Sequence, residues 1–164
     1  MEAIVAVYSD WGIGADGTQP VVVRADRKHF REVTGASAVI VGRKTLADFP
    51  GGRPLPGRVN IVLTRQALDI PGARVVHTAR EAVAAAAESG RCLVIGGASV
   101  YRALFDELER VYVTKLDVCP VSDSFFPDLD ADPAWACVDE GPWLTEGDVR
   151  YRFCTYERVG LGEE

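Results

Sequence analysis

Residues 92–99 read Cys-Leu-Val-Ile-Gly-Gly-Ala-Ser and carry the strongest fold signal in the chain. A short apolar run ends in two glycines and leads straight into a helical pattern. A continuous apolar run of this length is typical of a strand that is buried on both faces, as the strands of parallel sheets are. We therefore predict a strand over Cys92–Ile95 that is followed directly by a helix over Ala98–Asp106.

The same alternation of apolar runs and helical patterns continues on both sides of this stretch. Seven further strands are expected, at Ala3–Tyr8, Ala38–Val41, Val59–Leu63, Arg74–Val76, Arg110–Leu116, Ala136–Asp139 and Arg150–Arg158. Three further helices are expected, at Ala25–Thr34, Lys44–Phe49 and Ala79–Ser89. The last two strands have no helix between them and should pair antiparallel through Gly141 and Gly147. The prediction is an α/β fold with a mixed, mainly parallel, eight-stranded sheet.

Length and composition favour one compact domain over residues 1–164, with a frayed tail at 158–164, because a chain of 164 residues can bury a single sizeable core. The net charge of -6 argues against nucleic acid and favours a small-molecule partner. The first residues resemble neither a signal peptide nor a membrane span, so a cytoplasmic location is expected. No apolar heptad stands out, which favours a monomer.

The metal-ligating residue types are scattered along the chain. Cys92, Cys119, Cys137 and Cys154 form no C-x-x-C pair, and the two histidines stand alone. Buried free thiols are the simplest interpretation of the cysteines, and no metal site is predicted.

A glycine-rich segment over residues 12–17 follows the first predicted strand and matches the pattern G-x-G-x-x-G. In a dinucleotide-binding fold those glycines open a helix. Here Thr18, Gln19 and Pro20 follow, and then a run of valines. We therefore interpret the segment as a flexible loop beside a strand end, which could act as an active-site lid.

Two strand-to-helix turns are suited to phosphate. Gly42-Arg43-Lys44-Thr45 resembles the end of a P-loop, but Ser37 stands where that motif needs its first glycine, so nucleotide hydrolysis is not predicted. The second turn is Gly96–Ser99, where helix N–H groups would be open to an anion. Either turn could exist for packing alone. Their joint presence, with Thr64 and Arg65 after another strand, favours a long phosphate-bearing ligand, and NADP over NAD.

Asp26 lies in the first turn of the helix predicted over Ala25–Thr34, where a favourable interaction with the helix dipole would be an ordinary explanation. Phe30 lies one turn further along, so the acid and an aromatic ring share one face of the helix. A carboxylate beside an aromatic wall is suited to a flat, nitrogen-rich heterocycle.

In chain order these features resemble the dihydrofolate reductase family over nearly the whole chain. The matching motifs are Ile13-Gly14, Ala25-Asp26-x-x-x-Phe30, Val41-Gly42-Arg43-Lys44-Thr45, Arg53-Pro54-Leu55-Pro56-Gly57-Arg58, Ile95-Gly96-Gly97 and Tyr112-Val113-Thr114. The resemblance implies a three-layer α/β/α fold. It also implies NADPH-dependent hydride transfer to C6 of dihydrofolate with protonation at N5, in an enzyme that also binds antifolates.

By the same resemblance, Asp26 and Thr114 are the catalytic pair, and Arg58 binds the glutamate carboxylate of the substrate. The implied substrate-binding residues are Ile4, Val5, Ala6, Asp26, Arg27, Phe30, Phe49, Leu55, Arg58, Ile95, Tyr101 and Thr114. The implied NADPH-binding residues are Ala6, Ile13, Gly14, Gly42, Arg43, Lys44, Thr45, Leu63, Thr64, Arg65, Ile95, Gly96, Gly97, Ala98, Ser99, Val100 and Tyr101.

Two residues depart from the family pattern. Val21 stands where the family usually has Trp, and Arg27 stands where it usually has an apolar residue facing the substrate. Arg27 could turn outward, which we favour because Arg side chains readily reach solvent, or enter the pocket and select a more anionic substrate. Two alternative functions follow: a reductase of a related pterin or riboflavin-pathway pyrimidine, and a noncatalytic protein that binds NADPH or folate.

Overall fold

The structure, a computed structural model, describes residues 1–160, and their contacts divide into two compact units. Unit 1 consists of Arg31–Glu107 together with Met1. Unit 2 consists of Glu2–Phe30 and the described chain from Leu108 onward. The expected tail at 158–164 lies partly outside the described residues, and Arg158 is the last residue of a strand. The single domain over 1–164 stays a prediction.

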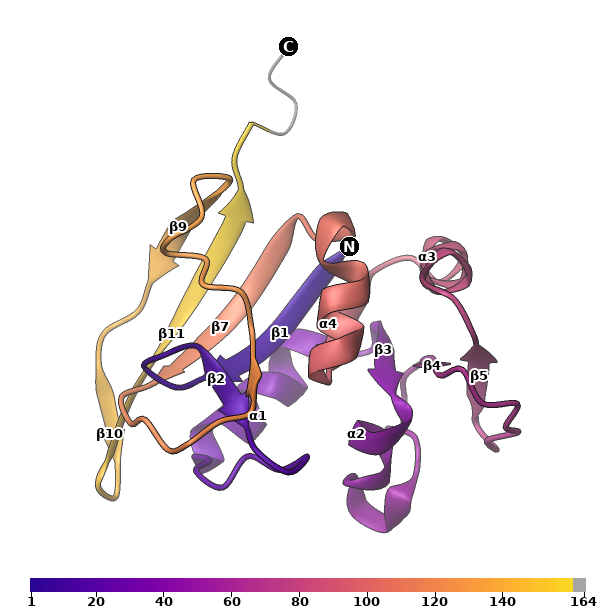
Figure 1. The fold of residues 1–164 in the computed structure, drawn as a ribbon, viewed down its shortest axis with the longest axis horizontal. Helices are drawn as coiled ribbons and strands as arrows, with labels where there is room; N and C mark the ends of the chain where they lie inside the picture. The colour runs from indigo at the N-terminus through magenta and orange to yellow at the C-terminus, as the bar shows by residue number, and fades with distance from the viewer. Residues whose placement is uncertain (161–164) are drawn as a thin grey trace. The chain divides into compact units, whose positions relative to one another are not determined.

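Unit 1 is made of four parallel strands with helices in the connections (Figure 1). The strands lie in the order β6 (Cys92–Gly96), β3 (Ala38–Gly42), β4 (Asn60–Leu63) and β5 (Ala73–Val76). The helices are α2 (Arg43–Ala47), α3 (Ala79–Glu88) and α4 (Ala98–Leu104), with 3-10 turns at Pro50–Gly52 and Phe105–Glu107.

The sequence explains these elements directly. Every residue of β3 and of β6 is buried, as expected for parallel strands covered on both faces. Thr78 caps α3, because its side chain accepts a hydrogen bond from the backbone N–H of Glu81. The buried face of α3 consists of Ala82, Ala85 and Ala86, whose small side chains allow close packing.

Unit 2 combines parallel and antiparallel pairing. Its strands lie in the order β1 (Glu2–Val7), β7 (Arg110–Leu116), β11 (Val149–Arg158) and β10 (Leu144–Glu146), and β9 (Trp135–Glu140) also pairs with β11. Only β1 and β7 run parallel. A separate two-stranded sheet joins β2 (Gly12–Gly14) to β8 (Ser124–Phe125). Helix α1 (Arg24–Thr34) begins in this unit.

All eight predicted strands and all four predicted helices are present, with ends that differ by one or a few residues. The predicted antiparallel pair is confirmed as β9 and β11, but the tight hairpin turn joins β10 to β11. Strands β2, β8 and β10 were not predicted, because they span three residues or fewer and carry no alternating pattern. Within residues 1–160, no helix has both the length and the apolar character needed to span a membrane.

The cysteine prediction was half right. Cys92 and Cys154 are buried free thiols, and burial raises the pKa of each to about 11. Cys119 and Cys137 are exposed, because one follows β7 in a loop and the other lies on β9, most of whose residues face solvent.

Glu146, the last residue of β10 before the turn to β11, caps helix α1. The carboxylate of Glu146 accepts hydrogen bonds from the backbone N–H groups of Arg24, at 2.6 Å, and Ala25, at 3.2 Å. These groups belong to the first turn of the helix and have no partner within it. The negative charge also favours the positive end of the helix dipole.

We expect Glu146→Ala to lower the free energy of unfolding by about 1 kcal/mol, the usual cost of losing a helix cap. Urea unfolding of the purified protein measures this change. Asp148→Ala is the matched control, since it removes an exposed carboxylate from the same turn. An equal loss in both variants would contradict the capping role.

Candidate functional site

A buried hydroxyl group pairs with a carboxylate in unit 2. The Oγ1 atom of Thr114, on β7, donates a hydrogen bond to Oδ1 of Asp26, in the first turn of α1, at 2.6 Å. Thr114 is fully buried, and Ala6 of β1 lies opposite it in the parallel ladder. The structure therefore brings together the two residues predicted to form the catalytic pair.

Burial raises the pKa of Asp26 above its ordinary value, and it outweighs two effects that lower the pKa. These are the hydrogen bond from Thr114 and the nearby His29, whose positive charge when protonated favours the carboxylate. The acid thus holds its proton to a higher pH than a solvated aspartic acid does. This direction of shift makes the carboxyl group a better proton donor at a given pH than a solvated aspartic acid would be.

His29 fixes the helix that carries Asp26. Its ring stacks on Phe153 of β11, with 4.1 Å between the ring centroids. Phe153 lies opposite Thr114 in the β11–β7 ladder, so the stacking partner and the hydroxyl partner of the helix are strand neighbours. This contact gives His29 a packing role in the structure.

Strand β1 supplies apolar residues next to Thr114. Ile4 and Val5 are buried, with 4% and 6% of their surfaces exposed. The carbonyl oxygen of Ala6 accepts a hydrogen bond from the Gln19 side-chain amide at 2.9 Å, a contact that no sequence pattern signalled. Gln19 therefore ties the glycine-rich loop to the strand.

The two residues that depart from the family pattern have distinct surroundings. The Val21 side chain packs against the apolar cluster that contains Tyr8, and its N–H donates to the Tyr8 hydroxyl at 3.2 Å. Arg27 is exposed to solvent, which agrees with the outward orientation that we favoured.

The glycine-rich loop is a hairpin rather than a helix start. Ala15 and Thr18 exchange two backbone hydrogen bonds of 3.0 Å, and β2 pairs with β8. A Cβ atom on Gly14 would lie 2.2 Å from the carbonyl oxygen of Thr18, so only glycine fits there. Asp123 also holds this loop, because its side chain accepts from the N–H of Asp16 at 2.9 Å.

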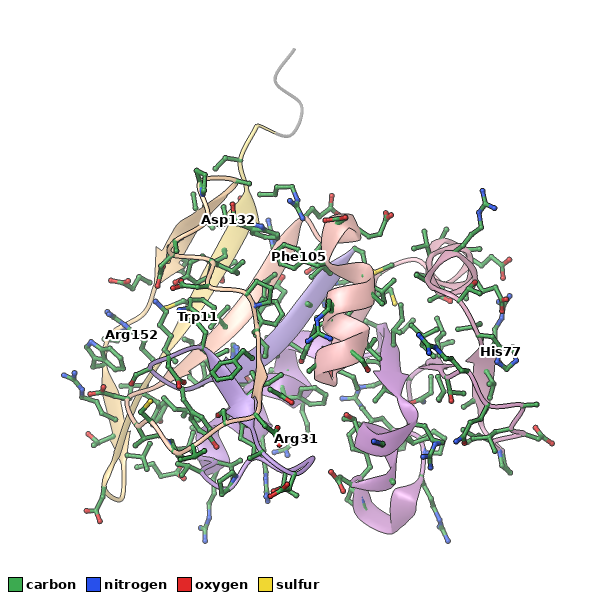
Figure 2. All side chains as sticks on the ribbon, in the orientation of Figure 1. Trp11, Arg31, His77, Phe105, Asp132 and Arg152 are labelled. Atoms are coloured by element: carbon green, nitrogen blue, oxygen red, sulfur yellow. The ribbon has the colours of Figure 1, made fainter. Side chains whose placement is uncertain are left out.

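The base of the loop is anchored by Trp11, which is labelled in Figure 2. Its ring lies against Phe126 and edge-on to Tyr156, with centroid separations of 6.5 and 5.9 Å. Trp11 is only 7% exposed, so the residue directly before Gly12 is packed among apolar side chains. Neither Trp11 nor Asp123 was singled out from the sequence.

In unit 1 the three predicted phosphate-binding segments follow adjacent parallel strands. Val41 lies opposite Gly96 in the β3–β6 ladder, and Gly42 lies opposite Leu63 in the β3–β4 ladder. The turns after β6, β3 and β4 therefore meet at one edge, outside the carboxyl ends of the strands. Nucleotides commonly bind at this position in α/β folds.

The two glycine turns are packed into each other. A Cβ atom on Gly97 would lie 2.9 Å from Oγ1 of Thr45, and one on Gly42 would lie 3.0 Å from Cγ2 of Val100. Neither α2 nor α4 has a side-chain hydrogen bond at its N-cap. The first N–H groups of these helices, with the cations of Arg43 and Lys44 beside one of them, suit the phosphates of a dinucleotide.

We expect Gly97→Ala to lower the free energy of unfolding by about 1–3 kcal/mol, the usual cost of overpacking. Thr45→Ala removes the atom that the new methyl group would meet, so the double variant should recover most of the loss. Thermal or urea unfolding of the two single variants and the double variant tests this. Purely additive losses would contradict the contact.

The segment that carries Leu55 and Arg58 is held by Asn60, which is 2% exposed. The Asn60 side chain accepts from the N–H of Leu55 and donates to its carbonyl oxygen, both at 2.9 Å. The guanidinium of Arg58 donates to Thr34 Oγ1 at 3.2 Å and to the Pro56 carbonyl at 3.0 Å. An open hollow of about 570 Å³ runs along Gly52–Arg58 and includes both predicted residues.

The predicted site residues thus fall into two groups. Unit 2 holds Ile4, Val5, Ala6, Ile13, Gly14, Asp26, Arg27, Phe30 and Thr114. Unit 1 holds Gly42, Arg43, Lys44, Thr45, Phe49, Leu55, Arg58, Leu63, Thr64, Arg65 and Ile95–Tyr101. Within unit 1, a residue that sequence reasoning left aside joins the group: Nδ1 of His77 lies 2.9 Å from the carbonyl oxygen of Thr64.

Comparisons with known proteins show which family the chain resembles. The family model described as dihydrofolate reductase matches residues 1–158. A dihydrofolate reductase of Haloferax volcanii is 35% identical over 94% of this chain and 81% of its own length. The dihydrofolate reductase of Bacillus subtilis is 33% identical over 94% of this chain and 92% of its own.

A solved structure is also similar over nearly its full length. It is the dihydrofolate reductase from Enterococcus faecalis complexed with NADP(H) and RAB-propyl. Its TM-score is 0.86 at 31% sequence identity, and the match covers 96% of this chain and 95% of that one.

The chain belongs to the dihydrofolate reductase family. The predicted family and the predicted α/β class, with its mixed, mainly parallel strands, are confirmed. The chain is an oxidoreductase that reduces dihydrofolate with NADPH.

Proposed function

We propose that Asp26, supported by Thr114, binds the pterin ring of 7,8-dihydrofolate and assists protonation of N5 while a hydride reaches C6, which yields 5,6,7,8-tetrahydrofolate. The 2.6 Å hydrogen bond between these residues supports the proposal, because it fixes one carboxylate oxygen and leaves the other for the substrate. When bound, NADPH supplies the hydride. The raised pKa of Asp26, caused by burial, suits a group that must assist protonation.

The remaining pocket residues bind and orient the substrate. Ile4, Val5 and Ala6 contribute the strand next to Thr114. As the family resemblance implies, we assign Phe30, Phe49, Leu55, Ile95 and Tyr101 to binding of the ring system, and Arg58 to the glutamate carboxylate. A planar guanidinium can hold a carboxylate with two parallel hydrogen bonds. Arg27, which is exposed, contacts the outer part of the substrate.

The edge formed by the turns after β3, β4 and β6 holds NADPH. Gly42–Thr45 and Gly96–Tyr101 bind the phosphates through helix N–H groups. Leu63, Thr64 and Arg65 bind the adenosine side, where the Arg65 guanidinium recognises the additional phosphate of NADPH. Ala6, Ile13 and Gly14 flank the nicotinamide.

The proposed function also bears on where the protein works and what it binds. A small anionic substrate and a net charge of -6 fit a soluble, cytoplasmic monomer that needs neither a nucleic acid nor a membrane. The pocket that accepts the pterin also accepts antifolate-like inhibitors. Membership of the family favours dihydrofolate over a riboflavin-pathway pyrimidine.

The loss of NADPH absorbance after addition of dihydrofolate tests this function, with NADH as the parallel cofactor. We expect rapid NADPH oxidation, and turnover with NADH that is slower by roughly tenfold or more, because contacts between Arg65 and the phosphate contribute about 1.5–3 kcal/mol. NADPH binding without oxidation would contradict the function. Equal use of NADH would contradict the role of Arg65 alone.

A further inference from the structure

Three potential metal ligands converge on strands β9 and β11, outside the residues assigned to dihydrofolate and NADPH. The thiol sulfurs of Cys137 and Cys154 and a carboxylate oxygen of Glu140 all lie within 4.8 Å of one another. Cys137 and Glu140 are exposed, whereas Cys154 is 3% exposed. The buried Cys154 is therefore held in place by its surroundings, whereas the exposed side chains of Cys137 and Glu140 can rotate.

A β-bulge creates this cluster. Cys154 lies opposite Glu140, so their side chains share one face of the sheet. In a regular ladder Tyr156 would face Val138, and Cys137 would point to the other face. The register shifts after Thr155, so that Tyr156 faces Cys137. The extra residue turns Cys137 onto the face of the other two ligands.

The donor set selects the kind of ion. Two thiols and one carboxylate match a thiophilic cation such as Zn²⁺, which binds cysteine and acidic ligands in tetrahedral sites. Mg²⁺ and Ca²⁺ prefer oxygen ligands only. Three protein ligands leave a fourth tetrahedral position for water.

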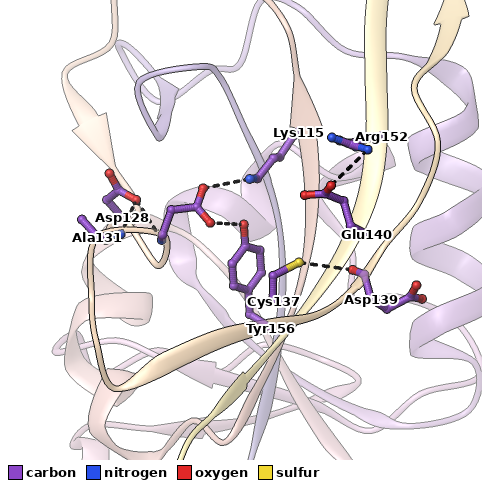
Figure 3. A network of polar contacts seen from close by, with 9 residues as sticks. Lys115, Asp128, Ala131, Cys137, Asp139, Glu140, Arg152 and Tyr156 are labelled. Carbon is purple, nitrogen blue, oxygen red and sulfur yellow. Dashed lines mark hydrogen bonds and ion pairs between the residues drawn. The ribbon is translucent and has the colours of Figure 1, made fainter.

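Neighbouring cations balance the charge of such a site. Figure 3 shows Arg152 beside Glu140, with Nη2 to Oε1 at 3.3 Å, and the nearby Lys115 paired with an aspartate. The Nε atom of Arg152 donates to the carbonyl oxygen of Gly141 at 2.9 Å, which keeps the guanidinium in place. Two thiolates and a carboxylate with one divalent cation leave a single negative charge, which Arg152 offsets.

We propose that Cys137, Glu140 and Cys154 form a binding site for a thiophilic divalent cation, Zn²⁺ by the chemistry of the ligands. Zinc–ligand distances of about 2.0–2.3 Å place two ligands of one ion roughly 3.5–3.8 Å apart, so the cluster must contract by roughly 1 Å. Rotation of the exposed Cys137 and Glu140 side chains provides this movement. The bound ion ties the edge strand β9 to β11.

Titration of the metal-free protein with Cd²⁺ tests the site, with a phosphine reductant keeping the thiols reduced. We expect an ultraviolet thiolate-to-metal charge-transfer band that saturates at one equivalent and is lowered by a large excess of Zn²⁺. Zn²⁺ should also raise the Tm, because it binds the folded chain.

Cys137→Ser is the decisive variant, since its exposed side chain can be replaced without disturbing the core. We expect it to weaken Zn²⁺ binding by more than about tenfold, at least the loss that follows removal of an outer-shell partner. Glu140→Gln should weaken binding in the same direction, and Cys119→Ser, the other exposed cysteine, should bind as the unaltered protein does. No band, or the same band in Cys137→Ser, would overturn the site. Dihydrofolate reduction is measured separately and does not bear on either outcome.

Discussion

Asp26→Asn lowers kcat for dihydrofolate reduction by about 100- to 10,000-fold near neutral pH, the range that a positioned acid contributes to catalysis. The asparagine side chain can still accept the Thr114 hydrogen bond but cannot assist protonation. Steady-state kinetics with saturating NADPH measure the effect. NADPH affinity should stay within about twofold, because the phosphate-binding turns lie in other segments of the chain.

Asp148→Asn is the matched control, because it changes an exposed aspartate of the same unit in the same way. Its kinetics should equal those of the unaltered protein. Turnover by Asp26→Asn within a few-fold of normal would contradict the assigned role. So would a similar loss in Asp148→Asn, which would indicate a general effect of the substitution.

Asp26→Asn should also stabilise the folded protein near neutral pH. Because burial raises the pKa of Asp26 in the folded state, the folded chain holds this proton to a higher pH than the unfolded chain does. The stability that the protonated acid contributes is fully present below the unfolded pKa and is lost as pH rises through the folded pKa. Asparagine has no charge to bury, so its advantage should grow over that pH window. Urea unfolding of both proteins across the window measures it.

Arg58→Leu raises KM for dihydrofolate by about 10- to 100-fold, because a lost hydrogen-bonded charge pair costs about 1.5–3 kcal/mol. The kcat should change little, since the glutamate tail contributes binding that is equal in the ground and transition states. The Arg58 guanidinium donates hydrogen bonds to Thr34 Oγ1 and to the Pro56 carbonyl oxygen, which orient the group. A guanidinium carries five N–H donors, so it can also bind a carboxylate.

A substrate without any carboxylate, 6-methyl-7,8-dihydropterin, separates recognition of the glutamate from folding of the segment. We expect Arg58→Leu to leave the KM for this substrate within about twofold of normal, because the substrate has no carboxylate for Arg58 to bind. Arg53→Leu removes an exposed arginine from the same segment and should affect neither substrate. A rise in KM for both substrates would show that Arg58 acts through the structure of the segment.

The periodicity of the sequence predicted most of the secondary structure. Apolar runs such as Val39–Val41 and Leu93–Ile95 are short, rich in β-branched residues and followed by glycine, which favours buried strands, and the alanine-rich α3 favours a helix. The segments that failed were β2, β8 and β10, where pairing partners and not local preference form the strand. Motif order along the chain was sufficient to identify the family.

The sequence by itself determined the eight longer strands, the helices and the chemical types of the site residues, because these depend on local pattern and on side-chain identity. Tertiary structure alone decided which residues meet. The Thr114–Asp26 bond, the Glu146 cap and the Cys137–Cys154 cluster join positions far apart in the chain. The cluster depends on a one-residue shift in the β9–β11 ladder, and such a shift is set by the packing of both strands and leaves no local signal in either of them.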